Sequence, residues 1–278
     1  MYTLNCKGRL VVIDTPVVMG IINTTPDSFY SGSRKQTIKA IVQEAGRMLS
    51  EGAVMLDIGG QSTRPGSERI PAQEEIQRVV PAIRAILDQH PEAILSIDTY
   101  SSPVAAAAMA AGASVINDIS SGDMDPEILS VAADNQAPYV CMHMRGKPDT
   151  MQLDPVYTNV TLEVLDYLVQ KITVCRAAGI HDVIADPGFG FGKNIRHNFT
   201  LLKELSAFHM MGVPVLAGLS RKSTIYKTLN ILPEEALNGT TVLNTIALMN
   251  GASILRVHDV KAAVEAVRLT YACQAAGA

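Results

Sequence analysis

The stretch Val17-Val18-Met19-Gly20-Ile21-Ile22 is a continuous apolar run that ends at the polar residue Asn23. A run of this kind predicts a strand that is buried on both faces, as in a parallel sheet. After a loop, apolar residues recur at helical spacing between positions 38 and 49, and Gly52 follows as a stop signal. The stretch therefore opens a unit of one strand followed by one helix.

The same unit recurs along the rest of the chain. Further strands are expected at 54–58, 93–97, 113–116, 138–142, 182–185, 213–217 and 253–257, each followed by a segment with helical periodicity. Eight such units without a linker predict one (β/α)8 TIM barrel, with residues 1–278 as a single domain. The alternative is a doubly wound open sheet, which the even units and the missing dinucleotide fingerprint disfavour.

The segments outside and between the strands give more local expectations. Residues 3–14 alternate loosely and turn at Lys7-Gly8, which predicts a short N-terminal hairpin that could plug one end of the barrel. Ser102 and Pro103 are expected to be the N-cap and first residue of the third helix. Buried stripes are expected from Leu162, Leu165, Val169 and Ile172 in the fifth helix, and from Val264, Val267 and Tyr271 in the last.

Composition narrows the class of function. The net charge of -4 and the lack of a dense Lys/Arg run argue against a nucleic-acid partner. No apolar run has membrane-spanning length and the start lacks a signal-peptide core, so we expect a cytoplasmic protein with no membrane partner. The cysteines are scattered without a C-x-x-C pair, which indicates neither a zinc site nor a disulfide framework.

Polar residues gather where the expected strands end. In a barrel these ends meet on one face, which would carry Asn23, Asp57, Asp98, Asn117, Met142, Asp186, Lys222, Arg256 and His258. One strand-end Asp is often only a helix cap, but several together indicate a site. Asp98, Asn117, Asp186 and Lys222 suit the edge of a nitrogen-rich heterocycle, whereas Thr63, Arg64, Arg256 and His258 suit phosphate.

The Gly-rich segment Asp186-Pro-Gly-Phe-Gly-Phe-Gly-Lys193 could suggest a phosphate loop, but a Walker A motif needs Gly at the position of Pro187 and Ser or Thr at that of Asn194. Nucleotide hydrolysis is therefore rejected. We expect the glycines to allow a planar ligand to approach the backbone, with Phe191 offering an aromatic face. A loop that is simply packed is the alternative.

Several segments together resemble the dihydropteroate synthase family. The matching motifs are Met19-Gly-Ile-Ile-Asn-Thr-Thr-Pro-Asp-Ser-Phe29, Asp57-Ile-Gly-Gly-Gln-Ser-Thr-Arg-Pro-Gly66, Ser96-Ile-Asp-Thr99, Asn117-Asp118, Asp186-Pro-Gly-Phe-Gly-Phe-Gly192, Gly218-Leu-Ser-Arg-Lys-Ser223 and Arg256-Val-His258. They occur in the family's order across essentially the whole chain. The resemblance implies transfer of the pterin methylene group of 6-hydroxymethyl-7,8-dihydropterin pyrophosphate to the amine of 4-aminobenzoate, with Mg2+, by a homodimer.

The resemblance also implies roles for individual residues. The pterin pocket would comprise Asp57, Asp98, Asn117, Met142, Asp186 and Lys222. Thr63, Arg64, Arg256 and His258 would hold the pyrophosphate, Pro65, Phe191 and Ser223 the aminobenzoate, and Asn23 the metal. Asp98, Asp186, Lys222 and Arg64 are the residues expected to act on the reacting groups.

Two positions depart from the family pattern. Gln61 stands where Glu is usual, and Ser31-Gly32-Ser33 replaces the usual Asp-Gly pair of the first loop. These changes bear on metal binding and loop ordering, so a non-catalytic pterin-binding paralogue remains an alternative. A corrinoid-linked methyltransferase is weakened, because the chain has no spare length for a cobalamin domain.

Overall fold

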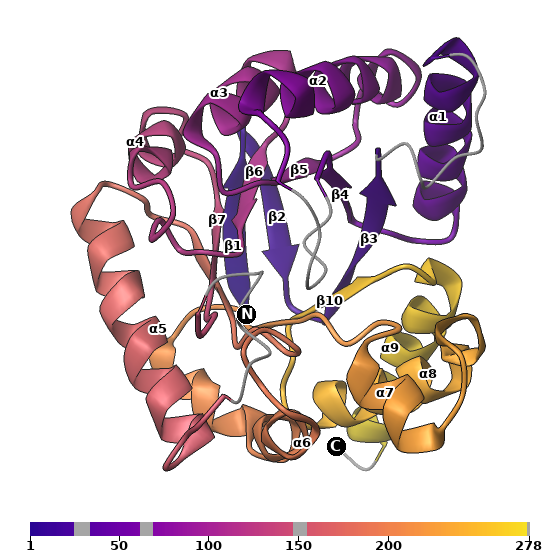
Figure 1. Ribbon diagram of the computed structural model, residues 1–278. Coiled ribbons are helices and arrows are strands. Elements are labelled where there is room, and N and C mark those ends of the chain that lie inside the picture. The colour runs from indigo at the N-terminus through magenta and orange to yellow at the C-terminus, as the bar shows by residue number, and fades with distance from the viewer. Residues whose placement is uncertain (25–33, 62–68, 147–154, 277–278) are drawn as a thin grey trace.

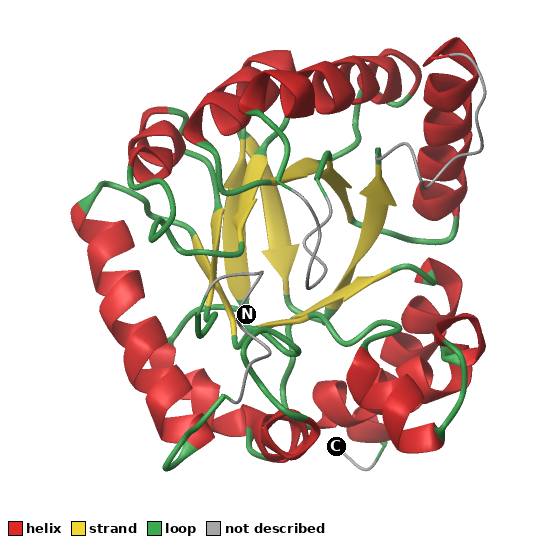
Figure 2. Ribbon diagram, in the orientation of Figure 1, coloured by secondary structure: helices red, strands yellow, loops and turns green. Residues whose placement is uncertain are grey.

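The protein is described from a computed structural model that covers residues 1–24, 34–61, 69–146 and 155–276. Parallel strands lie at the centre and helices surround them (Figures 1 and 2). The strands are β3 (Val17–Asn23), β4 (Met55–Gly59), β5 (Leu95–Asp98), β6 (Val115–Asp118), β7 (Tyr139–Met142), β8 (Val183–Asp186), β9 (Leu216–Ala217) and β10 (Ile254–Val257).

The order of the strands closes the sheet into a barrel. Hydrogen-bonded neighbours run β8-β7-β6-β5-β4-β3-β10-β9. The barrel strands that come first and last along the chain, β3 and β10, therefore pair with each other. A parallel bridge between Ala185 and Val215 then joins the two remaining edges. The predicted (β/α)8 barrel is thus confirmed, and the open doubly wound sheet is excluded.

The helices form the outer layer. They are α1 (Arg34–Ser50), α2 (Ala72–Gln89), α3 (Ser102–Ala111), α4 (Glu127–Asp134), α5 (Val160–Ala177), α6 (Ile195–Lys203), α7 (Ser223–Leu229), α8 (Leu237–Met249) and α9 (Val260–Ala275), with 3-10 turns η2 (Leu205–Met211) and η3 (Pro233–Glu235). In α2, Val79, Ile83 and Ile86 are fully buried because their spacing places them on the side that faces the sheet. None of the helices that the structure describes combines the length and apolar character needed to cross a membrane.

A hairpin of β1 (Tyr2–Cys6) and β2 (Arg9–Ile13) closes the amino-terminal end of the barrel. Its inward residues Leu4 and Val11 belong to the same apolar cluster as Met19 and Met55, which fill the barrel interior. Lys7 and Gly8 both have positive φ, as a tight hairpin turn requires. The predicted plug is therefore present, and the opposite end of the barrel is left for a site.

Three local predictions need correction. The N-cap of α3 is Ser101 rather than Ser102, and the amide of Ser102 is held by the carboxylate of Asp125 instead. In α5, Leu162 and Val169 are exposed, because the face against the sheet is rotated toward Val164, Leu165, Leu168, Ile172 and Cys175. In α9, Tyr271 is exposed because small residues, including Ala263 and Ala266, make the close contact.

Candidate active site at the carboxyl ends of the strands

Sheet register brings three of the predicted site residues close together at the ends of neighbouring strands. Asn23 pairs with Gly59, Gly59 with Asp98, and Asp98 with Asn117, across β3, β4, β5 and β6. A Cβ atom on Gly59 would lie 3.6 Å from Asn23 Oδ1 and 3.8 Å from Asp98 Oδ2. The side chains of Asn23 and Asp98 therefore flank this glycine at the mouth of the barrel.

A single guanidinium connects two of the buried carboxylates of the site, Asp57 and Asp98. Arg256 donates from Nε to Asp57 Oδ2 and from an Nη atom to Asp98 Oδ2, each at 2.6 Å. Asn117 donates to the same Asp57 oxygen at 2.9 Å. Strands β10, β4, β5 and β6 thus contribute to one network, which was not evident from the sequence, where Arg256 was assigned only to phosphate.

The other oxygen of each carboxylate is not engaged by any group in the described part of the chain. Asp57 Oδ1 and Asp98 Oδ1 are buried and have no hydrogen-bond partner among the described residues. A buried acceptor without a donor costs about 1–3 kcal/mol, so such atoms in a folded protein call for an explanation. Burial raises the pKa of Asp98 to about 7, and the positive charge of Arg256 opposes this rise. Both oxygens are suited to accept hydrogen bonds from a ligand.

Asp186 and Lys222 form the opposite side of the mouth. Asp186, at the end of β8, is buried and pairs in register with Met142 of β7. Burial raises the pKa of Asp186, while the charge of Lys222 lowers it. Burial in turn lowers the pKa of Lys222 to about 8. The Lys222 ammonium donates to the Phe189 carbonyl and lies 4.8 Å from the centre of the Phe191 ring.

The glycines of the 186–193 segment have a different use from the one expected. A Cβ on Gly188 would lie 1.9 Å from the carbonyl oxygen of His143, and one on Gly192 would lie 2.4 Å from that of Arg145. These two glycines therefore admit the chain that follows β7 rather than a ligand. The alternative of a packed loop is right for both, and Gly190 faces the side chain of Lys222.

His258 is tied to the loop that carries Lys222. Ser220 Oγ lies 3.0 Å from His258 Nδ1 and accepts a hydrogen bond from the His258 amide at 3.2 Å. Next to them, Arg221 donates to both oxygens of Asp259, each at 2.9 Å. These paired links, which the sequence analysis did not identify, join the end of β10 to the start of α7, where Ser223 is the first helical residue.

Three predicted site residues, Thr63, Arg64 and Pro65, lie outside the described residues, as do Ser31 and Ser33. Of the expected phosphate group, the described members are Arg256 and His258. Gln61, the other departure from the family pattern, donates from Nε2 to the Tyr100 hydroxyl at 2.9 Å. Its Oε1 is buried without a partner in the described part of the chain.

The fold and this mouth of buried carboxylates, lysine and arginine define a TIM-barrel enzyme with a site for a small polar molecule. Residues 19–258 match the family described as pterin binding enzyme. The chain is 44% identical over 271 residues to the dihydropteroate synthase of Escherichia coli K12, covering 97% of this chain and 95% of that one.

Solved structures agree with this match. Dihydropteroate synthase from Xanthomonas albilineans with 4-aminobenzoic acid superposes with a TM-score of 0.92, at 43% identity and 98% coverage of both chains. The same enzyme in complex with 7,8-dihydropteroate gives 0.88, at 41% identity and 99% coverage of both. The chain belongs to the dihydropteroate synthase family of pterin-binding enzymes, which are transferases of folate synthesis. These relatives favour the enzyme over the non-catalytic paralogue.

Proposed function

We propose that this chain joins 6-hydroxymethyl-7,8-dihydropterin pyrophosphate to 4-aminobenzoate, giving 7,8-dihydropteroate and pyrophosphate, and that the pterin binds between Asp57, Asp98, Asn117, Met142, Asp186 and Lys222. The observation that carries the placement is the pair of buried oxygens on Asp57 and Asp98 that have no hydrogen-bond partner among the described residues. A pterin ring edge presents N–H donors that can satisfy such acceptors. Lys222 supplies a donor on the opposite side, where the ring has acceptor atoms.

The reaction needs no covalent nucleophile from the protein. The exocyclic methylene of an electron-rich pterin can carry positive charge, so the carbon–oxygen bond can break ahead of attack by the amine. Asp98 and Asp186 then favour the developing cation, and the proton leaves the amine after the new carbon–nitrogen bond has formed. The fixed charges of the pocket therefore act electrostatically on the transition state.

The pyrophosphate end of the substrate would meet Thr63, Arg64, Arg256 and His258. Arg256 suits this role because its side chain is 20% exposed while it holds Asp57 and Asp98. Its positive charge therefore lies between the pterin pocket and the solvent at the mouth of the barrel. Departure of pyrophosphate leaves negative charge beside this cation. Arg256 would thus stabilise the departing pyrophosphate, while it also holds in place the carboxylate of Asp98 that favours the cation.

Mg2+ fits the donor chemistry at the end of β3. Asn23 offers an uncharged, hard oxygen near Asp98, and Mg2+ is usually held by one or two protein oxygens together with substrate phosphate and water. Asn23 would hold the ion, which when bound supplies positive charge to the departing pyrophosphate. This arrangement does not need a larger cluster of acidic, His or Cys ligands, and the described residues contain none.

The aminobenzoate would lie beside Pro65, Phe191 and Ser223. The Phe191 ring offers an aromatic face next to Lys222, so an aminobenzoate stacked on it would have its amine near the pterin. Residues 1–278 would act as one pterin-binding domain in the cytoplasm, where the four free thiols of Cys6, Cys141, Cys175 and Cys273 suit a reducing environment.

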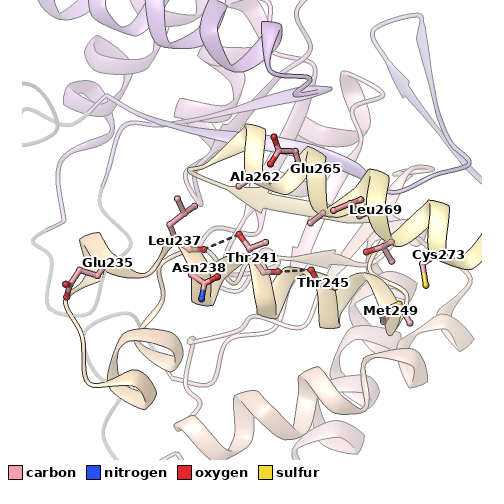
Figure 3. A pocket seen from close by; sticks show the side chains of 12 residues that line it. Glu235, Leu237, Asn238, Thr241, Thr245, Met249, Ala262, Glu265, Leu269 and Cys273 are labelled. Atoms are coloured by element: carbon pink, nitrogen blue, oxygen red, sulfur yellow. Dashed lines mark hydrogen bonds between the residues drawn. The ribbon is translucent and has the colours of Figure 1, made fainter.

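A homodimer is part of the proposal. A groove between α8 and α9 is lined by both polar and apolar side chains, and the apolar ones include Leu237, Met249 and Leu269 (Figure 3). Leu269 is 73% exposed and Met249 55% exposed, and contiguous apolar surface of this kind marks a contact site. We expect Leu269→Asp to shift the protein from dimer to monomer in analytical ultracentrifugation. A wild-type protein that sediments as a monomer would contradict the dimer.

The direct test of the reaction is incubation of the protein with the pterin pyrophosphate, Mg2+ and 4-aminobenzoate. We expect a product with the mass of 7,8-dihydropteroate, formed with one equivalent of pyrophosphate. Omission of 4-aminobenzoate is the control. Binding of the pterin without formation of this product would instead support the non-catalytic paralogue.

A further inference from the structure

Lys193 is a buried lysine that the proposed reaction does not use. It ends the Gly-rich segment and is only 2% exposed. Its Nζ lies 2.9 Å from the Gly188 carbonyl oxygen, 3.0 Å from that of Phe191, and 2.8 Å from His143 Nδ1. The His143 carbonyl oxygen is a fourth neighbour, at 3.3 Å. The side chain thus points back under its own loop, into a cage of acceptors.

The cage defines the proton positions. Carbonyl oxygens only accept hydrogen bonds, and an ammonium has three protons, which match Gly188 O, Phe191 O and His143 Nδ1. His143 must then be neutral with its proton on Nε2. This agrees with its pKa, which burial and the charge of Lys193 lower to about 2. Burial also lowers the pKa of Lys193 well below its ordinary value, whereas the charge of Asp186 and the acceptors of the cage favour the ammonium.

The loop fixed by this cage holds three groups of the proposed site. The Gly188 amide donates to Asp186 Oδ1 at 2.7 Å, so the position of Gly188 orients that carboxylate. The Phe189 carbonyl, between the two carbonyls that Lys193 binds, accepts from Lys222. The Phe191 ring lies against the same Lys222 ammonium. The carbonyl oxygens of this loop therefore accept hydrogen bonds from two lysines, Lys193 below the loop and Lys222 in the pocket.

We propose that Lys193, paired with neutral His143, is a positioning residue that sets the loop geometry on which Asp186, Phe191 and Lys222 depend. This inference rests on the proposed function, because it assigns those three residues to the substrates. Lys193 itself touches neither substrate. Its effect is to keep the Gly188 and Phe191 carbonyls turned away from the pocket, which leaves Phe189 O as the partner for Lys222.

The test replaces Lys193 by Met, which keeps the length of the side chain but removes every donor. We expect the Kd for 6-hydroxymethyl-7,8-dihydropterin and the KM for 4-aminobenzoate each to rise about tenfold or more, since small displacements of positioned groups have large effects. The Kd for pyrophosphate should change by less than about twofold, because Arg256 lies on β10 and His258 directly follows that strand, away from this loop.

The matched control is Lys7→Met, which removes a lysine that donates to the Met109 carbonyl at 2.5 Å near the opposite end of the barrel. It should leave all three constants within about twofold of wild type. If Lys193→Met changes the pterin and aminobenzoate constants no more than Lys7→Met does, the inference is wrong. Should the Met variant fail to fold, Lys193→Gln retains two N–H donors and should show a smaller loss of affinity for both ligands.

A spectroscopic measurement separates this inference from the proposed reaction. The chain has six histidines, so 15N resonances of the imidazoles can be assigned by single substitutions. We expect His143 Nδ1 of the wild-type protein to be unprotonated from pH 5 to pH 8 and to shift in Lys193→Met. A protonated Nδ1 would overturn the cage even in an active enzyme. A protein that does not bind pterin but has the expected His143 spectrum would overturn only the proposed function.

Discussion

Asp98 and Asp118 end neighbouring strands of the barrel and are both buried, but their hydrogen bonding differs. Both oxygens of Asp118 have partners: Oδ1 accepts from the amide and hydroxyl of Ser120, and Oδ2 accepts from the Gly122 amide at 2.7 Å and the Tyr139 hydroxyl at 2.6 Å. Asp98 uses one oxygen for Arg256 and leaves Oδ1 without a partner in the described structure.

This difference separates residues that hold the fold from residues available to a ligand. A carboxylate whose oxygens are all engaged has nothing left to offer a substrate, whereas a buried unpartnered oxygen is stabilised when a donor arrives. The two buried lysines differ in a similar way. Lys193 is surrounded by acceptors of the chain itself, while Lys222 has one carbonyl partner and faces Asp186 and the Phe191 ring.

The largest effect on stability should come from Arg256→Ala. The change leaves the Asp57 and Asp98 carboxylates buried together without their cation, and loss of one partner of a buried ion pair lowers the free energy of unfolding by about 3 kcal/mol. Urea unfolding measures it. The control is Arg47→Ala, whose guanidinium is 47% exposed in an ion pair of α1 and should matter little. Equal losses of unfolding free energy in the two variants would show that the buried network of Arg256 with Asp57 and Asp98 does not stabilise the fold more than an exposed ion pair does.

Asp118→Asn should come next in size. The amide nitrogen replaces an acceptor that faces several donors, so we expect about 2 kcal/mol less free energy of unfolding. Pterin affinity should stay at the wild-type value, because no oxygen of Asp118 is available to the ligand. Calorimetry on the folded variant measures the pterin affinity. A loss of affinity would contradict the proposed difference between Asp118, which holds the fold, and Asp98, which binds the ligand.

A smaller effect is expected on the pH dependence of stability. The pKa of Asp98 is about 7 in the folded protein and about 4 in an unfolded chain, so the folded state binds this proton more tightly. Asp98 therefore contributes stability below about pH 4 that is lost as the pH rises through 7. Urea unfolding at pH 5 and pH 8 should show a smaller difference for Asp98→Asn than for wild type. The same difference in both proteins would contradict the raised pKa.

The smallest change is expected for Gln61→Glu, which introduces the carboxylate usual in the family. The new charge lies at the end of β4 and should lower the Mg2+ concentration for half-maximal activity by a few-fold, roughly 1 kcal/mol or less. Pterin affinity should not change. Tyr100→Phe is the control, since it removes the partner of Gln61 without adding charge. If Gln61→Glu and wild type need the same Mg2+ concentration for half-maximal activity, this position does not influence metal binding.

Much of the fold was predictable because its signals are local. The apolar run of β3, the Gly52 stop signal and the Lys7-Gly8 turn can each be recognised from a few neighbouring residues. The buried sides of α5 and α9 were harder to predict from the sequence. They depend on how each helix packs on the barrel, and Leu162 and Tyr271 are apolar residues that simply face outward.

The site shows the same division. Strand-end polar residues such as Asp57 and Asn117 could be predicted to share one face, because parallel strands of a barrel end together. Their partners could not: Arg256 lies 199 positions from Asp57 in sequence, and His143 lies 50 from Lys193. The Gly-Lys193 pair was an available signal for a buried cation, but the sequence did not indicate that Lys193 would turn under its own loop.

The most direct measurement is the calorimetric affinity of 6-hydroxymethyl-7,8-dihydropterin for wild type, Asp98→Asn and Asp118→Asn. We expect Asp98→Asn to lose about tenfold or more in affinity, since the amide presents a donor where the ring needs an acceptor. Asp118→Asn should bind the pterin with the wild-type affinity, although this variant is expected to be less stable than the wild-type protein. Wild-type affinity in folded Asp98→Asn, or an equal loss in both variants, would contradict the assignment of the unpartnered oxygens to the pterin.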